Sequence, residues 1–148
     1  MTPDRPVVVA LGAVDPTLVN GVLGGGISFL AEPSADDLAV AVGAIARADA
    51  VVDNAFFEQA PRLRVVARTG VGVDLVDLAA ASARGIPVVI TPGSGTRAVA
   101  EGVLAFALHL VKRLGPLTRL IREGRWAARD EVAVGDLDGA SIGIVGYG

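Results

Sequence analysis

The 148-residue sequence contains no cysteine and a single histidine. Without cysteine, the chain can form neither a disulfide framework nor a cysteine-based zinc site, and it has no cysteine nucleophile. Basic residues are also few: the chain has 13 Lys+Arg and 16 Asp+Glu, which give a formal net charge of −3. A nucleic-acid partner would require a basic balance, so we expect none.

Long uninterrupted apolar runs are absent as well. The apolar stretch near the N-terminus is too short for a secretory signal. The most apolar later stretch, residues 98–114, is interrupted by Glu101, His109, Lys112 and Arg113, which makes it a poor membrane span. We therefore expect no membrane partner and a cytoplasmic protein.

Hydrophobic residues make up 52% of the chain and charged residues 20%, a composition that can bury a core in one compact domain. Short β-branched runs alternate with longer alanine-rich stretches, and this alternation predicts an α/β domain with a parallel sheet. The runs are continuously apolar, as is typical of strands buried on both faces. The sequence thus predicts a flavodoxin-like doubly wound parallel sheet, with ligand-binding loops at the carboxyl ends of its strands.

The order of the expected elements follows from turn and cap residues. Ser34 with the two aspartates after it predicts a helix start, and Gly85 suits the left-handed position after a helix. A helix near the middle of the chain is apolar on nearly every side, which predicts burial between two bodies. Strands are expected at 6–11, 27–31, 50–52, 61–68, 86–90 and 141–145, and helices at 16–23, 34–47, 75–84, 97–114 and 116–124.

A glycine turn, G-V-G-V-D at residues 70–74, follows the fourth expected strand. Glycines allow a sharp turn that points consecutive N–H groups at one spot, and such a nest binds a carboxylate or a phosphate. A tight strand–helix turn with Asp74 as the helix cap is the alternative interpretation.

A second turn, T-P-G-S-G-T at residues 91–96, precedes the long helix. Donors at a helix N-terminus can contact a phosphate or a carboxamide. A plain helix entry capped by Ser or Thr fits the same residues.

The segment G-I-V-G-Y-G at residues 143–148 has the form of a strand that runs into G-x-G. This is how a dinucleotide-binding motif begins, with two glycines for the turn and for the approach of the pyrophosphate. The helix, third glycine and ribose-binding acid that complete the motif are not among the 148 residues, so we expect the cofactor site in this chain to be incomplete.

The remaining candidates predict structure rather than chemistry. His109 has no carboxylate or hydroxyl nucleophile nearby in the sequence. None of the close carboxylate pairs has a histidine or a further acid at metal-ligand spacing. Trp126 is interpreted as a packing or interface anchor. Four arginines at helical spacing predict a solvated cationic stripe, namely Arg119, Arg122, Arg125 and Arg129.

Four motifs occur in a fixed order: R-x-G-x-G-V-D at 68–74, G-I-P-V at 85–88, T-P-G at 91–93 and V-A-E at 99–101. At this spacing they resemble the D-isomer-specific 2-hydroxyacid dehydrogenase family, and phosphoglycerate dehydrogenase-like members most. The resemblance covers residues 61–148, while the first half of the chain matches in pattern only.

The resemblance implies an oxidoreductase that transfers a hydride between NAD, with NADP left open, and C2 of a small 2-hydroxy or 2-keto acid such as 3-phosphoglycerate. It divides the chain into a substrate-binding part (1–96), a connecting helix with a dimer-contact arm (97–140) and the first strand of a Rossmann NAD-binding domain (141–148). The region around Gly124 and Trp126 resembles that arm, so a homodimer is expected.

The resemblance also implies roles for single residues. The backbone N–H groups of Gly70, Val71 and Gly72 would hold the substrate carboxylate. The family's catalytic Arg, Glu and His lie beyond residue 148, so we assign no catalytic residue and expect the 148-residue chain alone to be inactive. The cofactor would contact Val71, Thr96, Gly146 and Gly148.

This sequence departs from the family at three places. Relatives often carry an arginine after the third strand, where it reaches the substrate, whereas this chain has Val52-Asp53-Asn54 after the expected strand. Ile90 and Leu75 stand where the family usually has asparagine.

Two functions of other classes are alternatives for an α/β domain of this kind. A non-enzymatic module that binds a small anion, or senses a dinucleotide, fits the same fold and glycine turn. A phosphoacceptor receiver domain would need a lysine near Asp53, and the chain's one lysine, Lys112, lies on the wrong helix. The sequence therefore argues against a receiver domain.

Overall fold

The computed structural model describes residues 5–146. The chain divides into two compact units, one that ends at Ser94 and one that begins at Gly95. The first unit holds the sheet and the second holds helices, and each is described by itself.

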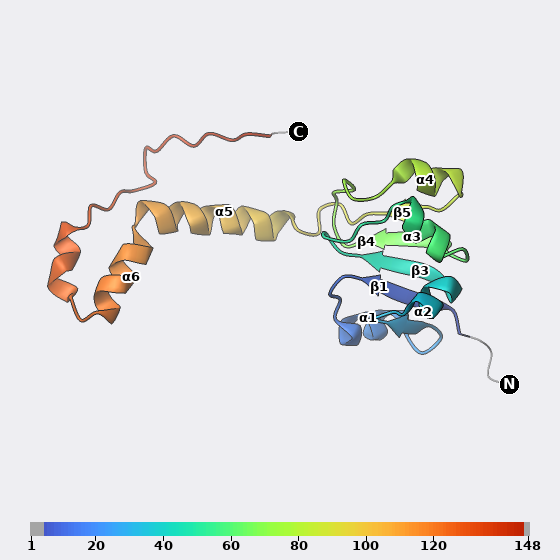
Figure 1. Ribbon diagram of the computed structural model, residues 1–148. Coiled ribbons are helices and arrows are strands. Elements are labelled where there is room, and N and C mark those ends of the chain that lie inside the picture. The colour runs from blue at the N-terminus through green and yellow to red at the C-terminus, as the bar shows by residue number, and fades with distance from the viewer. Residues whose placement is uncertain (1–4, 147–148) are drawn as a thin grey trace. The chain divides into compact units, whose positions relative to one another are not determined.

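The sheet of the first unit has five parallel strands. They are β1 (Val7–Leu11), β2 (Ser28–Leu30), β3 (Ala41–Ala46), β4 (Val65–Arg68) and β5 (Val88–Val89). Their spatial order is β2-β1-β3-β4-β5 (Figure 1). This is the flavodoxin-like order, so the predicted doubly wound parallel sheet is confirmed.

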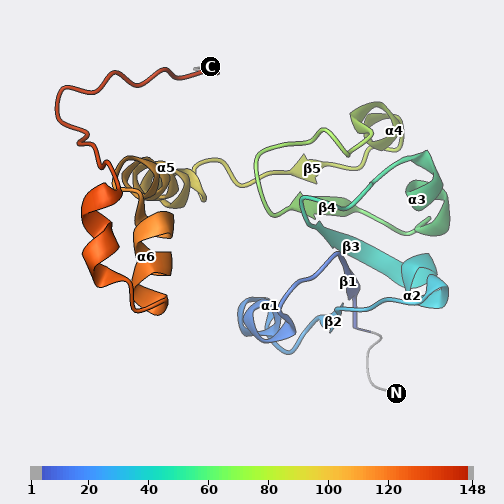
Figure 2. The same cartoon turned by 60° about the vertical axis from the view of Figure 1, so that its left-hand side comes forward.

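Four helices cover this sheet unevenly. They are α1 (Pro16–Leu23), α2 (Ala35–Val40), α3 (Asn54–Gln59) and α4 (Leu78–Ala83). Figure 2 shows α1 on one face and α2, α3 and α4 on the other. Right-handed crossovers require this, because the chain steps one way from β1 to β2 and the opposite way through the remaining strands.

The hydrophobic core lies under α2, α3 and α4. Val9 and Val66 of the sheet are fully buried there, and Phe57 of α3 packs against the same cluster. On the opposite face, Val8 and Val65 flank Gly43 and are only half-buried. One side of the sheet is therefore packed and the other is partly open.

The predicted helix at 34–47 is only half correct. α2 begins after Ser34, whose side chain caps it as expected, but it ends at Val40. Residues 41–46 are the central strand β3, hydrogen-bonded to β1 and β4. Alanine favours helix locally, and pairing on both sides with burial between two strands overrides that preference.

The predicted third strand at 50–52 is therefore wrong. Val52 forms only an isolated bridge with Val76, in which its N–H donates to the Leu75 carbonyl at 2.9 Å. The helix that follows, α3, was not predicted. Asp53 caps it by accepting from the Phe56 N–H at 2.9 Å.

The second unit contains α5 (Thr96–Val111), α6 (Leu114–Arg122) and the 3₁₀-helix η1 (Trp126–Glu131). The predicted helices at 97–114 and 116–124 are confirmed with shifted ends. None of the α5 residues is buried in the part of the chain that the structure describes, so the apolar sides of this helix are exposed. Its burial between two bodies stays a prediction. The chain turns at Gly124, with φ 69°, directly after α6. Arg119 and Arg122 lie in α6, Arg125 precedes η1 and Arg129 lies in η1, so the four arginines do not form one continuous helical stripe.

The predicted strand at 141–145 is not formed. Residues 141–146 are irregular, and Ile142, Ile144 and Val145 are exposed. A strand needs a neighbour to accept and donate its backbone hydrogen bonds, and none of the described residues pairs with this segment.

Candidate functional site

The carboxyl edge of the sheet brings four loops side by side. Hydrogen bonds link them in sequence: the Arg47 N–H donates to the Leu11 carbonyl at 2.9 Å, and the Thr69 N–H donates to the Ala46 carbonyl at 3.0 Å. The Thr91 N–H then donates to the Gly70 carbonyl at 3.0 Å. In a doubly wound sheet, this edge is where ligands bind.

The glycine turn after β4 presents unused donors at this edge. Within residues 5–146, the N–H groups of Gly70, Val71 and Gly72 donate to no acceptor. The Val71 side chain is 55% exposed. Asp77, and not Asp74, caps α4 by accepting from the Ala80 N–H at 2.8 Å, so the interpretation of Asp74 as the cap is wrong.

The two glycines of this turn are not needed for a left-handed backbone. Neither Gly70 nor Gly72 has a positive φ. A Cβ at Gly70 would lie 3.6 Å from Arg68 Nη1, an ordinary contact, and a Cβ at Gly72 would lie 3.2 Å from Asp74 Oδ2. The fold therefore tolerates a small side chain at Gly70, and what glycine provides there is clearance above the N–H groups.

Two arginines stand at the ends of neighbouring strands along this edge, and Arg68 is the one that lies close to the glycine turn. Arg68 ends β4 and pairs in register with Ala46, the last residue of β3. The next residue, Arg47, follows β3 directly. Arg47 is therefore an arginine directly after the third strand, contrary to the departure inferred from the sequence. The sequence pattern predicts that strand at 50–52, nine residues after the true start of β3, and so does not reveal this arginine.

Arg47 lies closely against the loop that follows β1. A Cβ on Gly12 would come within 2.8 Å of the Arg47 Cβ. Gly12 also has φ 95°, a conformation that side chains rarely adopt. The fold itself therefore requires glycine at this position, because a side chain would collide with Arg47 and would force a strained backbone.

The turn after β5 is held by its own side chains. The Ser94 hydroxyl donates to the Thr91 carbonyl at 2.9 Å. The cap residue of α5 is Gly95, and no side chain caps this helix. A Ser- or Thr-capped helix entry is therefore wrong, and the backbone donors at this end of α5 have no side-chain acceptor.

The predicted cofactor residues lie in different parts of the chain. Val71 belongs to the glycine turn, and Thr96 is the first residue of α5 in the second unit. Gly146 has φ 83°, as a G-x-G turn requires, while Gly148 lies outside the described residues. Their roles remain predictions.

Residues 5–146 contain neither a metal-binding cluster nor a membrane-spanning helix. No three His, Asp or Glu side chains gather closely enough to hold a metal ion. No helix in this range has both the length and the apolar character needed to cross a membrane.

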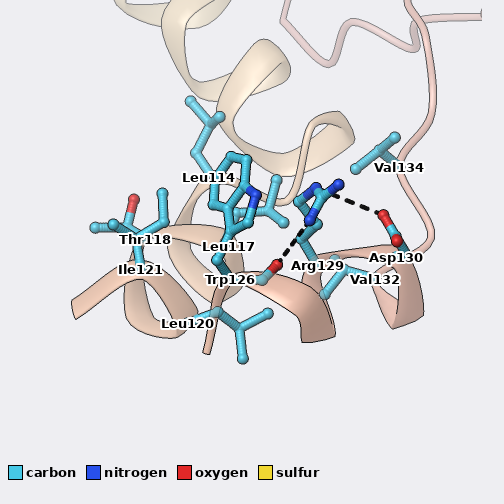
Figure 3. Close-up of a pocket in the computed structure, with 10 residues that line it drawn as sticks. All are labelled: Leu114, Leu117, Thr118, Leu120, Ile121, Trp126, Arg129, Asp130, Val132 and Val134. Carbon is cyan, nitrogen blue, oxygen red and sulfur yellow. Dashed lines mark hydrogen bonds and ion pairs between the residues drawn. The ribbon is translucent and has the colours of Figure 1, made fainter. Parts of the chain in front are cut away.

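The second unit carries an apolar groove of about 560 Å³ between α6 and η1 (Figure 3). Trp126 forms one wall, and the Arg129 guanidinium stacks 4.6 Å from its ring centre. Arg129 also donates to the Trp126 carbonyl at 3.1 Å and lies 3.5 Å from Asp130. The other lining residues are Leu114, Leu117, Thr118, Leu120, Ile121, Val132 and Val134.

Residues 23–134, more than half of the chain, match the family model of the D-isomer specific 2-hydroxyacid dehydrogenase catalytic domain. The chain belongs to this family. The resemblance inferred from the ordered motifs is therefore confirmed.

Individual members of the dehydrogenase family resemble the chain at moderate identity. D-3-phosphoglycerate dehydrogenase of Archaeoglobus fulgidus is 34% identical over 70% of this chain and 20% of the relative. NADPH-dependent glyoxylate/hydroxypyruvate reductase of Sinorhizobium meliloti, solved with citrate, is 26% identical with a TM-score of 0.74, over 91% of this chain and 45% of that one.

A third similarity concerns the fold alone. D-lactate dehydrogenase of Aquifex aeolicus, solved with NAD and lactic acid, has a TM-score of 0.77 at 21% identity. That alignment covers 90% of this chain and 42% of the other. The chain thus spans from about a fifth to less than half of the length of these dehydrogenases.

Proposed function

We propose that this chain is the substrate-binding part of a nicotinamide-dependent oxidoreductase that transfers a hydride between the cofactor and C2 of a small 2-hydroxy or 2-keto acid. The observation that carries the proposal is the glycine turn, where three unused N–H groups lie at the ligand-binding edge of a dehydrogenase-family sheet. The cytoplasm, where nicotinamide cofactors are abundant, is its proposed compartment.

In this proposal the turn binds the substrate carboxylate. Hydrogen bonds from backbone N–H groups to a carboxylate are charge-assisted, and they fix the direction in which C2 points. Arg68 adds a positive charge beside the turn, and Arg47 adds a second one farther along the same edge, against the loop after β1. Two cations on this edge favour an acid with a second anionic group, such as 3-phosphoglycerate. We assign no proton-transfer step to any residue of this chain.

The cofactor proposal rests on the residues that would contact it. An exposed Val71 gives an apolar surface suited to the nicotinamide ring, and the left-handed Gly146 suits the turn of a dinucleotide motif. The bound dinucleotide would supply the hydride acceptor or donor. NAD and NADP are both compatible, since the similar structures include one solved with NAD and one described as NADPH-dependent.

The proposed partner at the protein level is a second copy of the chain. The groove beside Trp126 presents apolar side chains to solvent, with Ile121 56% and Trp126 59% exposed. Exposed aromatic and aliphatic side chains around a groove are typical of protein interfaces. We propose that this groove belongs to a homodimer contact.

The carboxylate site is tested by binding to the 148-residue chain. Titration with 3-phosphoglycerate, glyoxylate and hydroxypyruvate, followed by amide NMR, is expected to shift the signals of Gly70, Val71 and Gly72. In Gly70→Val the side chain covers these N–H groups, and loss of charged hydrogen bonds should weaken binding by about 10- to 100-fold.

Gly25→Val is the matched control, because a side chain at Gly25 meets no atom within 4 Å. Equal affinity in both variants would contradict the site. The chain alone is expected to show no turnover of NAD(H), and measurable turnover would overturn the assignment of the catalytic groups to another part of the enzyme. Binding of peptides with no response to these acids would favour a non-enzymatic module.

A further inference from the structure

The chain has two asparagines, and one of them, Asn20, is followed directly by glycine. In an Asn-Gly pair the backbone nitrogen of glycine can attack the side-chain carbonyl carbon of asparagine, because glycine has no side chain to hinder the approach. Asn20 and Gly21 both lie in the exposed helix α1. The other asparagine, Asn54, precedes Ala55 and is hydrogen-bonded to Glu58 and Arg84.

An intact helix blocks this reaction. In a helix each N–H points along the axis toward the carbonyl four residues earlier, and the backbone dihedral angles hold it away from its neighbour's side chain. The nitrogen of Gly21 reaches the side chain of Asn20 only after α1 opens. The reaction rate therefore reports how often this helix unfolds locally.

Several features make α1 easy to open. It has eight residues, and none of them is buried. Leu18 is 71% and Val22 86% exposed, so the helix gains little from packing. Gly21 lies in its interior, where glycine is the least favourable residue after proline. Figure 2 shows α1 as the only one of the first unit's four helices on its face of the sheet, so no other helix of that unit supports it there.

We propose that Asn20 is a site of spontaneous deamidation that is controlled by the opening of α1. The Gly21 nitrogen forms a bond to Asn20 Cγ, the side-chain nitrogen leaves as ammonia after taking up the proton of the Gly21 N–H, and a succinimide ring results. One water then opens either ring carbonyl. The products are aspartate, or isoaspartate with one additional atom in the main chain, and water is the co-reactant consumed.

Either product disrupts α1. Asn20 lies in the C-terminal half of the helix, where the helix dipole disfavours a new negative charge. Its carbonyl also accepts the Gly24 N–H at 3.1 Å, which closes the helix end. Isoaspartate displaces this carbonyl. Because α1 begins at the loop after β1, the change would loosen one border of the carboxyl edge that holds the candidate site.

The test follows the 148-residue chain during incubation at mildly alkaline pH. Isoelectric focusing should show an acidic species, with equal release of ammonia, and peptide mapping should place the change at Asn20. Asn54 is the internal control and should remain intact. Isoaspartate alone is not a sufficient readout, because the Asp138–Gly139 pair can isomerise with neither ammonia release nor a change of charge.

Two variants separate the chemistry from the opening of the helix. Asp15 caps α1 by accepting the Thr17 N–H at 2.8 Å, and Asp15→Ala should raise the deamidation rate roughly five-fold, the factor that corresponds to loss of an N-cap. Gly21→Ala introduces a Cβ that meets no atom within 4 Å, and it should nearly abolish the reaction. The double variant should also be unreactive although its cap is lost.

Two results would overturn the proposal. One is a rate in the intact chain equal to that of a peptide of residues 14–26 and unchanged by Asp15→Ala, because the helix would then exert no control. The other is ammonia release that continues in Gly21→Ala or that maps to Asn54.

Discussion

At the scale of single residues, glycine serves two different purposes along the carboxyl edge. Gly12 is required by the backbone and by the closeness of Arg47, whereas Gly70 has room for a small side chain. The amino-acid sequence does not distinguish these two glycines. The structure separates a glycine that the fold needs from one that keeps space over free N–H groups.

The structural glycine can be tested by a pair of substitutions. Gly12→Ala forces a side chain into φ 95° and places its Cβ 2.8 Å from Arg47 Cβ. Gly85→Ala imposes only the left-handed conformation, at φ 66°, with no atom within 4 Å. We expect Gly85→Ala to cost about 1 kcal/mol and Gly12→Ala to cost about 1–3 kcal/mol more, in urea unfolding. Equal losses would contradict the close approach of Arg47.

Asp37 links the cap of α2 to pH. The hydroxyl of Ser34 donates to its carboxylate at 2.7 Å and the Ser34 N–H at 2.9 Å, and these bonds lower the pKa of Asp37. Because the folded pKa is lowered, the stabilisation is complete above the pKa of the unfolded chain. It is lost as pH falls through the folded pKa.

Ser34→Ala removes the larger of the two causes and should raise the pKa of Asp37 toward its ordinary range. NMR titration of the Asp37 carboxyl carbon measures this. Ser141→Ala, at an exposed position outside any helix, is the control and should leave the Asp37 titration unchanged. An unaltered pKa in Ser34→Ala would show that the capping box does not persist in solution.

At the scale of elements, sequence reasoning succeeded where local signals and pairing agree. The strands β1 and β4 are β-branched runs, and their positions were predicted. The strand β3 has the sequence AVGAIA, in which alanine favours helix and small side chains suit a buried centre. Pairing with β1 and β4 decides that the segment is a strand and not a helix. Because this pairing is not visible in the sequence, the position of Arg47 directly after a strand was not predicted either.

The junction between α5 and α6 offers a prediction at this scale. Arg113 lies there at φ 53°, the one non-glycine residue with positive φ in residues 5–146. This position normally suits glycine. Arg113→Gly should stabilise the helical unit by about 0.5–1 kcal/mol, since relief of the left-handed strain exceeds the entropy cost of glycine.

Thermal unfolding followed by circular dichroism checks Arg113→Gly. The matched control is Arg122→Gly, at the end of α6, which should destabilise by up to about 1 kcal/mol because its backbone is helical. If both substitutions destabilise equally, the left-handed junction is not maintained in solution.

At the scale of the whole molecule, much apolar surface is exposed. Phe106 of α5 is 72% and Ile121 of α6 is 56% exposed, and one face of the sheet is only partly covered. Exposed apolar surface of this kind favours association. We therefore expect the 148-residue chain to self-associate and to bind a hydrophobic dye.

The proposed homodimer predicts which substitution prevents association. Ile121→Glu places a charge in the groove beside Trp126 and should raise the dissociation constant of the dimer by about 10-fold or more. Light scattering over a concentration series measures this constant. Leu18→Glu is the control, because Leu18 is 71% exposed on α1, outside the groove. Equal effects would point to non-specific aggregation, and a dye-silent monomer would contradict the interface.

The sequence by itself determined the parallel α/β class, the family and the glycine turn, because apolar periodicity, caps and ordered motifs are local properties of the chain. Tertiary structure decided which alanine-rich residues became the central strand, that Arg47 follows it, and that Asp77 caps α4. The sequence of residues 141–145 predicts a strand, yet the segment is irregular because no described strand pairs with it. Hydrogen bonding between strands is non-local, and a sequence pattern cannot specify the partner that completes it.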